Sequence, residues 1–175
     1  MILQHPLITR HWPLLAALIS AAMLATAHGF EHFAHLAPCE LCYRQREVYW
    51  LALVLGLVVM LVQYKKPASR MMQGGLALLG LVFLTGALVA GYHAGVEWKF
   101  WPGPSSCTGS LAELANMGAD LLNDLSQPSD APKCDQIPWA MFGLSMAGWN
   151  ALISLVLAAI SFQLALSRPK QQVTL

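Results

Sequence analysis

Charged residues are scarce in this sequence. Only 11% of its 175 residues are Asp, Glu, Lys or Arg, whereas soluble globular domains usually carry about 25%. A folded chain of this size leaves a large surface to be wetted, and 57% of its residues are hydrophobic. The composition therefore excludes an ordinary soluble enzyme and indicates that lipid covers much of the surface.

An excess of charge of one sign is also lacking. Ten basic and nine acidic residues leave a net charge of +1, so no long-range field attracts a polyanion. We therefore expect no nucleic-acid partner. Cysteine is limited to four residues, an even number that is compatible with two disulfides, two redox pairs or one metal site.

Long uncharged runs occupy most of the chain. A helix needs about 20 apolar residues to cross a membrane, and four runs meet this requirement. We predict an all-α fold in which the whole chain forms one membrane domain, a four-helix bundle with helices at about residues 12–30, 48–64, 71–96 and 147–166. A short interfacial segment, residues 137–146, is expected to precede the last helix.

The basic residues predict the orientation of the bundle. Six of the ten lie at the termini and in the short second connection: Arg10, Lys65, Lys66, Arg70, Arg168 and Lys170. The positive-inside rule assigns these regions to the cytoplasm. Both termini are then cytoplasmic, and the outer connections 31–47 and 97–135, which hold all four cysteines, face an oxidising compartment. A cleaved signal peptide ending near residues 25–27 is disfavoured, because the apolar run continues to Phe30.

Two cysteines spaced three residues apart precede the second apolar run. Cys39 and Cys42 follow Pro38, and proline is favoured in the first turn of a helix. Both thiols are therefore expected on one face at a helix N-terminus, where the dipole stabilises a thiolate. Arg46 lies one turn beyond Cys42 and can hold an anion or a polar oxygen. Zinc sites also use this spacing, but they usually supply a second close pair, so we expect a redox pair and no metal.

The second outer connection contains the other two cysteines, Cys107 and Cys134, separated by 26 residues. Between them, Ser110 and Glu113 form a capping box that predicts a short helix on the membrane surface. We expect both cysteines in irregular, exposed surroundings. A disulfide between them would be reachable by an incoming thiolate, although a bridge that only stabilises the loop is the alternative.

Six histidines raise the possibility of a haem protein. His28, His32 and His35 surround the first outer connection, and His93 lies near the outer end of the third helix. His28 and His93 could face each other as haem ligands. We favour interface-seeking histidines as the explanation.

Taken together, these motifs resemble the disulfide bond formation protein B (DsbB) family of bacterial inner-membrane thiol oxidases. The resemblance rests on the run PCELCYRQR at residues 38–46, Tyr92 with His93, the sequence GPSSC ending at Cys107, and Cys134 followed by PW and FGLS at residues 138–145. It covers most of the chain.

The resemblance implies a function, a location and site residues. Such an enzyme reoxidises a periplasmic thioredoxin-fold dithiol protein of the DsbA type and passes the electrons to a membrane quinone, either ubiquinone or menaquinone, and thereby keeps the bacterial periplasm oxidising. The partner would attack Cys107, Cys134 would exchange with Cys39, and Cys42 would be released as a thiolate beside the quinone. Arg46 and His93 match residues near the quinone.

Two other functions fit parts of the sequence. Enzymes of the vitamin K epoxide reductase type are also four-helix thiol enzymes linked to quinones, but their Cys-x-x-Cys lies on the last helix of the bundle. The alternative that is not an enzyme is a membrane scaffold with inert structural disulfides.

Overall fold

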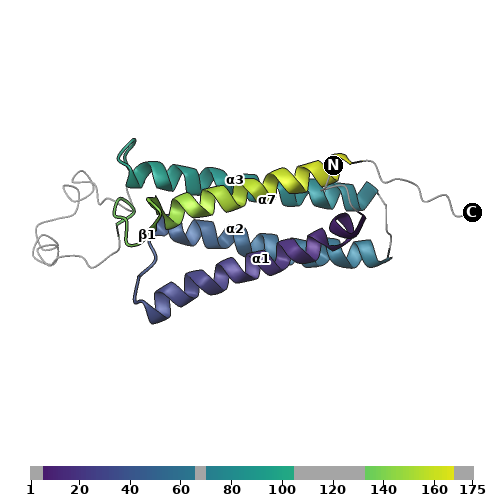
Figure 1. Cartoon of the computed structure of the whole chain (residues 1–175), viewed down its shortest axis with the longest axis horizontal. Coiled ribbons are helices and arrows are strands. Elements are labelled where there is room, and N and C mark those ends of the chain that lie inside the picture. The colour runs from purple at the N-terminus through teal and green to yellow at the C-terminus, as the bar shows by residue number, and fades with distance from the viewer. Residues whose placement is uncertain (1–5, 66–69, 105–132, 168–175) are drawn as a thin grey trace, which may run out of the picture.

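The computed structural model describes residues 6–65, 70–104 and 133–167 of the chain. Four long helices lie side by side in an elongated bundle (Figure 1): α1 (Pro6–Phe33), α2 (Glu40–Lys65), α3 (Arg70–Glu97) and α7 (Met146–Leu166). Each helix contains a stretch that is long and apolar enough to cross a membrane. The predicted all-α four-helix membrane bundle is therefore confirmed.

The helices extend beyond the uncharged runs that predicted them. The largest difference is in α2, which was expected to begin near residue 48 and begins at Glu40. Charged side chains in this added segment have partners, because Arg44 lies 3.3 Å from Glu47 and Arg46 lies 2.5 Å from Glu31. A helix can therefore continue past the hydrocarbon region, and counting uncharged residues underestimates its length.

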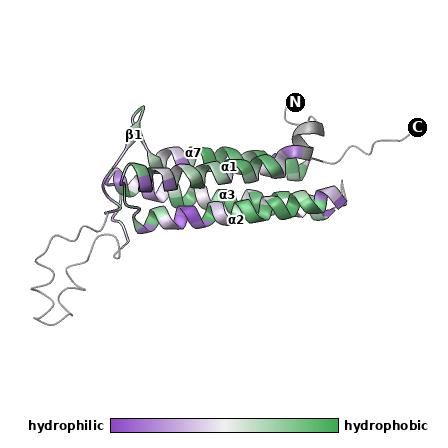
Figure 2. Ribbon diagram, turned by 90° about the horizontal axis from the view of Figure 1, so that it is seen from below, coloured by the Kyte–Doolittle hydropathy of each residue, from purple (hydrophilic) through white to green (hydrophobic). Residues whose placement is uncertain are grey.

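The two ends of the bundle differ in chemistry. The start of α1, the end of α2, the start of α3 and the end of α7 lie at one end, and the hairpin strand β1 lies at the other (Figure 1). Hydrophobic residues cover most of each helix, while hydrophilic residues gather toward the β1 end (Figure 2). Toward that end α1 also diverges from α3 and α7 (Figure 1). The polar residues of the bundle are therefore concentrated where the loops that bear the cysteines meet the helices.

The surface of the bundle suits lipid, and its interior is tightly packed. Large apolar side chains point outward from all four helices and are more than half exposed, including Leu18, Leu61, Leu88 and Val156. Inside, Leu76, Leu79 and Phe83 of α3 are completely buried. Close packing also depends on Gly86, because a Cβ atom there would lie 3.0 Å from Cγ1 of Val48 on α2 and 3.3 Å from Oγ of Ser154 on α7.

A short hairpin precedes α7, within the segment that was expected to lie at the interface. Strands β1 (Ala140–Met141) and β2 (Leu144–Ser145) pair in antiparallel fashion. Phe142 and Gly143 form the turn with φ of 53° and 79°, the positive values that two-residue hairpin turns require. Ser145 then caps α7 by accepting the N–H of Gly148. The hairpin thus fixes where the last helix begins.

We predict that Gly86→Val destabilises the protein by about 1–3 kcal/mol, because the new side chain overpacks the junction of α2, α3 and α7. Gly91→Val is the matched control on the same helix, since a Cβ atom there meets nothing within 4 Å. Thermal unfolding in detergent measures both variants. Equal losses of stability would contradict the proposed close contact at Gly86.

Candidate active site

Cys39 and Cys42 form the centre of the site, at the N-terminus of α2. The carbonyl of Cys39 accepts the N–H of Tyr43 at 3.1 Å, and its sulfur accepts the N–H of Cys42 at 3.4 Å. Cys39 therefore occupies the N-cap position, and Pro38 precedes the helix instead of lying in its first turn. The two Sγ atoms are 2.9 Å apart and both thiols are free. Closing a disulfide needs an approach of about 1 Å.

His93 of α3 contacts this pair. Its Nε2 lies 3.7 Å from Sγ of Cys39, and its side chain is only 5% exposed. The hydrogen bond with Cys42 and burial both raise the pKa of the Cys39 thiol above its usual value, whereas the contact with His93 lowers it. His93 is therefore the neighbour that favours the thiolate form of Cys39.

Arg46 lies on the same helix and is held at the edge of the site. Its guanidinium donates to Oε2 of Glu31 at 2.5 Å and to the carbonyl of Ala27 at 3.1 Å, both on α1. Its side chain is 12% exposed. Arg46 thus carries a partly buried positive charge between α1 and α2, where a polar oxygen can compete with Glu31 for its N–H groups.

Cys134 is buried against the thiol pair, and the expectation of an exposed position is wrong. Its side chain has no exposed surface, it packs with Cys39, Leu41 and Val96, and it is disulfide-bonded. Its backbone also interacts with His93. Cys107, Ser110 and Glu113 lie outside the described residues. The structure therefore brings a disulfide sulfur and two free thiols into one cluster.

An ion pair next to Cys134 explains part of this burial. Nζ of Lys99, which follows α3, lies 2.6 Å from Oδ2 of Asp135 and 2.8 Å from its carbonyl oxygen. The hydrogen bond from Lys99 lowers the pKa of the Asp135 carboxyl. These contacts attach the segment that contains Cys134 to the end of α3.

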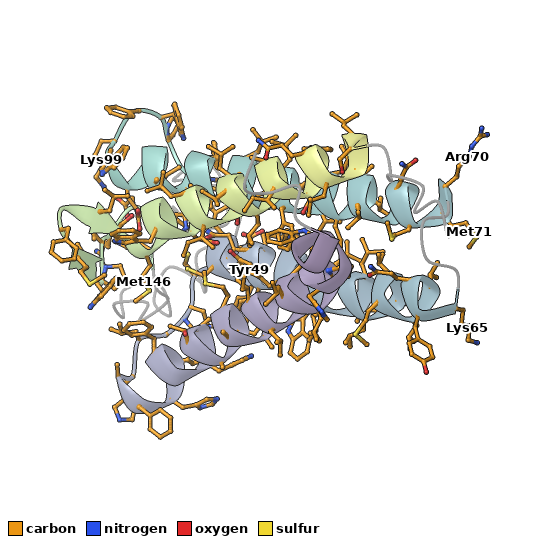
Figure 3. The ribbon with its side chains drawn as sticks, turned by 45° about the vertical axis from the view of Figure 1, so that its right-hand side comes forward. Tyr49, Lys65, Arg70, Met71, Lys99 and Met146 are labelled. Carbon is orange, nitrogen blue, oxygen red and sulfur yellow. The ribbon has the colours of Figure 1, made fainter. Side chains whose placement is uncertain are left out.

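A cavity of about 400 Å³ adjoins the sulfurs. Its wall is mostly apolar, and most of the polar side chains in it come from α2, α3 and α7, with Thr26 from α1 and with Lys133 and Gln136 from the segment before the hairpin. The lining includes Met23, Leu24, Phe30, Cys39, Cys42, Gln45, Arg46, Tyr49, His93, Trp139, Met146, Asn150 and Ile153. Tyr49 lies near the middle of the bundle, with Lys99 and Met146 at one end and Lys65 and Arg70 at the other (Figure 3). The cavity is of the size and character typical of sites for small apolar ligands.

Sequence reasoning missed several polar residues of the site. Gln45 and Asn150 are buried and bonded to each other, and Glu97 accepts a hydrogen bond from Ser145 beside His93. The available signal was their position, because polar side chains within membrane spans usually face the interior and serve a function. Asn150, Ser154 and Ser161 also recur at helical spacing on α7.

The side chains around Cys39 also bear on whether this site could hold a metal ion or a haem. One ligand atom from each of Cys39, Cys42 and His93 lies within 4.8 Å of the others, which is close enough for a thiophilic metal. A four-cysteine zinc site does not fit, because Cys134 is disulfide-bonded. A haem held by His93 is disfavoured, because both of its ring nitrogens already face partners, Gln45 and Cys39.

The fold and the site together define a multi-pass membrane protein with a reactive cysteine centre at one end of its bundle. A family model described as "Disulfide bond formation protein DsbB" matches residues 9–164. The chain belongs to this family. It is accordingly a disulfide-forming oxidoreductase of the membrane, and the free thiols Cys39 and Cys42 do not fit a scaffold with only inert disulfides.

Individual relatives agree with the family model. The chain is 32% identical over 145 residues to Disulfide bond formation protein B of Alkalilimnicola ehrlichii, covering 81% of this chain and 84% of the relative. It is 30% identical over 163 residues to the protein of the same name from Nitrosomonas europaea, covering 89% of this chain and 92% of the relative. No solved structure was found to match.

The ion pair of Lys99 and Asp135 predicts a pH dependence. Because the pKa of Asp135 is lower in the folded protein, the stabilising contact is complete above its unfolded value of about 4 and is lost as the pH falls through the lower folded value. We expect reduction of the Cys134 disulfide by a water-soluble phosphine, relative to a peptide disulfide, to be constant from about pH 7 to 5 and faster at the most acidic pH.

Variants of the Lys99–Asp135 ion pair test whether it holds the segment that contains Cys134 in place. Lys99→Met should accelerate the same reduction about threefold at neutral pH, as expected for an exposed pair. Arg44→Met, which removes a different exposed ion pair with Glu47, should keep the wild-type profile. A wild-type profile in Lys99→Met would rule out the tethering role.

Proposed function

We propose that this protein is a thiol:quinone oxidoreductase that reoxidises a periplasmic dithiol protein of the thioredoxin fold and transfers the electrons through its two cysteine pairs to a membrane quinone. One observation carries the proposal: a buried disulfide sulfur, Cys134, packs against Cys39, whose thiol pair with Cys42 lines an apolar cavity. Electrons can therefore pass from a loop disulfide to the membrane interior by thiol exchange between neighbours.

The outer pair is proposed to be Cys107 and Cys134. Cys134 is disulfide-bonded and Cys39 and Cys42 are free, which leaves Cys107 as its partner in a chain of four cysteines. A thiolate of the partner protein attacks Sγ of Cys107, and Cys134 leaves with the electron pair of the broken bond. The second thiol of the partner then displaces Cys107, so the partner leaves with a disulfide.

The inner pair receives the electrons in a second exchange. The Cys134 thiolate attacks Sγ of Cys39 in an oxidised Cys39–Cys42 pair, and Cys42 leaves as a thiolate. Cys107 then re-forms its bond to Cys134 and releases Cys39. In sum, the partner dithiol becomes a disulfide and the inner disulfide becomes a dithiol, with two electrons and two protons transferred.

The residues around the cavity fit a quinone. Its volume of about 400 Å³ lies within the usual range for small-molecule sites, and the combination of an apolar wall with a few polar groups is typical of them. Cys39 and Cys42 border this space, and Arg46 supplies N–H donors for a ring oxygen. A bound quinone would supply a lipid-soluble acceptor for two electrons. By giving up these electrons, the Cys39–Cys42 dithiol would return to the disulfide.

The proposed location is the bacterial inner membrane, with both termini in the cytoplasm and the cysteines on the periplasmic side. Lys65 and Arg70 lie at the end of the bundle opposite Lys99 and Met146 (Figure 3). By the positive-inside rule the end with Lys65 and Arg70 is cytoplasmic. The sulfur cluster, next to Lys99, is then at the oxidising side.

Cysteine variants test the pathway directly. We expect Cys42→Ser and Cys107→Ser to reduce quinone-dependent oxidation of a reduced thioredoxin-like protein to background, because each removes a sulfur without which electrons cannot pass. Quinone absorbance and partner thiols are followed together. Wild-type turnover in either variant would exclude the proposed sequence of exchanges.

Arg46 tests the quinone site separately. Arg46→Met should raise the KM for quinone about tenfold, the effect of one lost charge-assisted hydrogen bond, while exchange between the partner and the cysteines continues. Arg44→Met is the control, because Arg44 lies on the same helix and is exposed. Equal KM values in the two variants would show that Arg46 does not hold the acceptor.

A further inference from the structure

A continuous chain of buried hydrogen bonds connects the middle of the bundle to Cys39. Tyr49 of α2 donates to Oδ1 of Asn150 on α7. Nδ2 of Asn150 donates to Oε1 of Gln45 at 2.5 Å. Nε2 of Gln45 lies 2.8 Å from Nδ1 of His93, whose Nε2 lies 3.7 Å from the Cys39 sulfur. The chain therefore joins α2, α3 and α7 through residues whose side chains are all buried.

The direction of every bond in this chain follows from one fixed acceptor. The carbonyl oxygen of Leu41 can only accept, and it lies 3.1 Å from the amide of Gln45. The Gln45 atom facing it must therefore be the NH₂ group. The opposite assignment of the amide would place two oxygens against each other at Leu41.

The orientation of Gln45 then decides the protonation of His93. Because the NH₂ group also faces Nδ1 of His93, this nitrogen must present a lone pair. A neutral imidazole has one N–H, and here it is on Nε2. The neighbours of Nε2 agree, since the Cys39 sulfur at 3.7 Å and Oε1 of Glu97 at 3.9 Å can both accept from an N–H.

We propose that Gln45, supported by Asn150 and Tyr49, is a positioning residue that holds His93 in the Nε2–H tautomer, so that the neutral imidazole donates a hydrogen bond to the sulfur of Cys39. In this arrangement Nε2 of His93 already carries a proton. It could take the Cys39 proton only if its own proton moved to Nδ1, which would break the hydrogen bond from Gln45. It acts as a fixed donor and not as a base.

A fixed donor is useful at this sulfur. Whenever Cys39 leaves a disulfide it takes the electron pair of the broken bond and becomes a thiolate, inside a cluster where it is 6% exposed. An N–H already directed at the sulfur stabilises that charge without reorganisation. The consequence for turnover rests on the proposed function, whereas the tautomer itself does not.

The tautomer can be read directly by ¹⁵N NMR of histidine-labelled protein in detergent, with the His93 signals assigned by their loss in His93→Phe. We expect an unprotonated Nδ1 and a protonated Nε2 in the wild type. In Gln45→Glu, a carboxylate facing Nδ1 accepts a hydrogen bond, so Nδ1 should become protonated. A protonated Nδ1 in the wild type, or an unchanged pattern in Gln45→Glu, would overturn the proposal.

A second measurement separates positioning from a merely structural role. In a Cys42→Ala background, Gln45→Met should slow alkylation of Cys39 about tenfold, the effect of one lost hydrogen bond to a charged group. Gln63→Met is the matched control, because Gln63 is buried on the same helix and its Oε1 has no hydrogen-bond partner among the described residues. Equal rates in the two variants, at equal thermal stability, would contradict the proposal.

Neither measurement uses a quinone or a partner protein, so the two proposals fail separately. The expected NMR pattern without quinone-dependent turnover would leave the tautomer standing and remove the proposed function. Normal turnover with the opposite tautomer would do the reverse.

Discussion

The structure depends on the requirement that polar groups inside a membrane find partners within the protein. Gln45, Tyr49, His93, Asn150 and Ser154 come from three helices and satisfy one another by hydrogen bonds. Because these bonds have fixed directions, they set the rotation of α2, α3 and α7 about their axes. The apolar contacts around them pack the helices together, and the polar chain positions His93 beside the sulfur of Cys39.

The placement of the cysteines brings a loop and a membrane-spanning helix together at one cluster. Cys39 ends a loop and caps a helix, while Cys42 is already within the membrane-spanning helix. Cys134 reaches the same cluster from a separate segment of the chain, which Lys99 and Asp135 hold to the end of α3. A disulfide sulfur, two thiols and the wall of an apolar cavity therefore meet in one buried group of atoms.

Much of this could be predicted from the sequence, and the exceptions have physical causes. Uncharged runs and the spacing of Cys39 and Cys42 indicate four spans and a reactive pair, because these depend on local composition. The burial of Cys134 depends on Lys99, which is distant in the chain, and no local pattern reports such a contact. The hairpin at residues 140–145 was missed because Phe142 adopts a positive φ, which is unusual for a bulky residue.

Helix α1 differs from the other three helices in what it contributes to the site. It packs closely on α2 around Gly56. Polar contacts also join it to the bundle, a hydrogen bond from Trp12 to Ser161 near one end and the contacts of Arg46 with Glu31 and Ala27 near the other. It contributes Met23, Leu24 and Phe30 to the cavity wall but no member of the polar chain. Helix α1 therefore bounds the cavity mostly with apolar side chains, whereas the sulfurs and the polar chain belong to the other side of the cavity. A substitution among the α1 side chains would accordingly reshape the cavity and leave the hydrogen bonds around Cys39 in place.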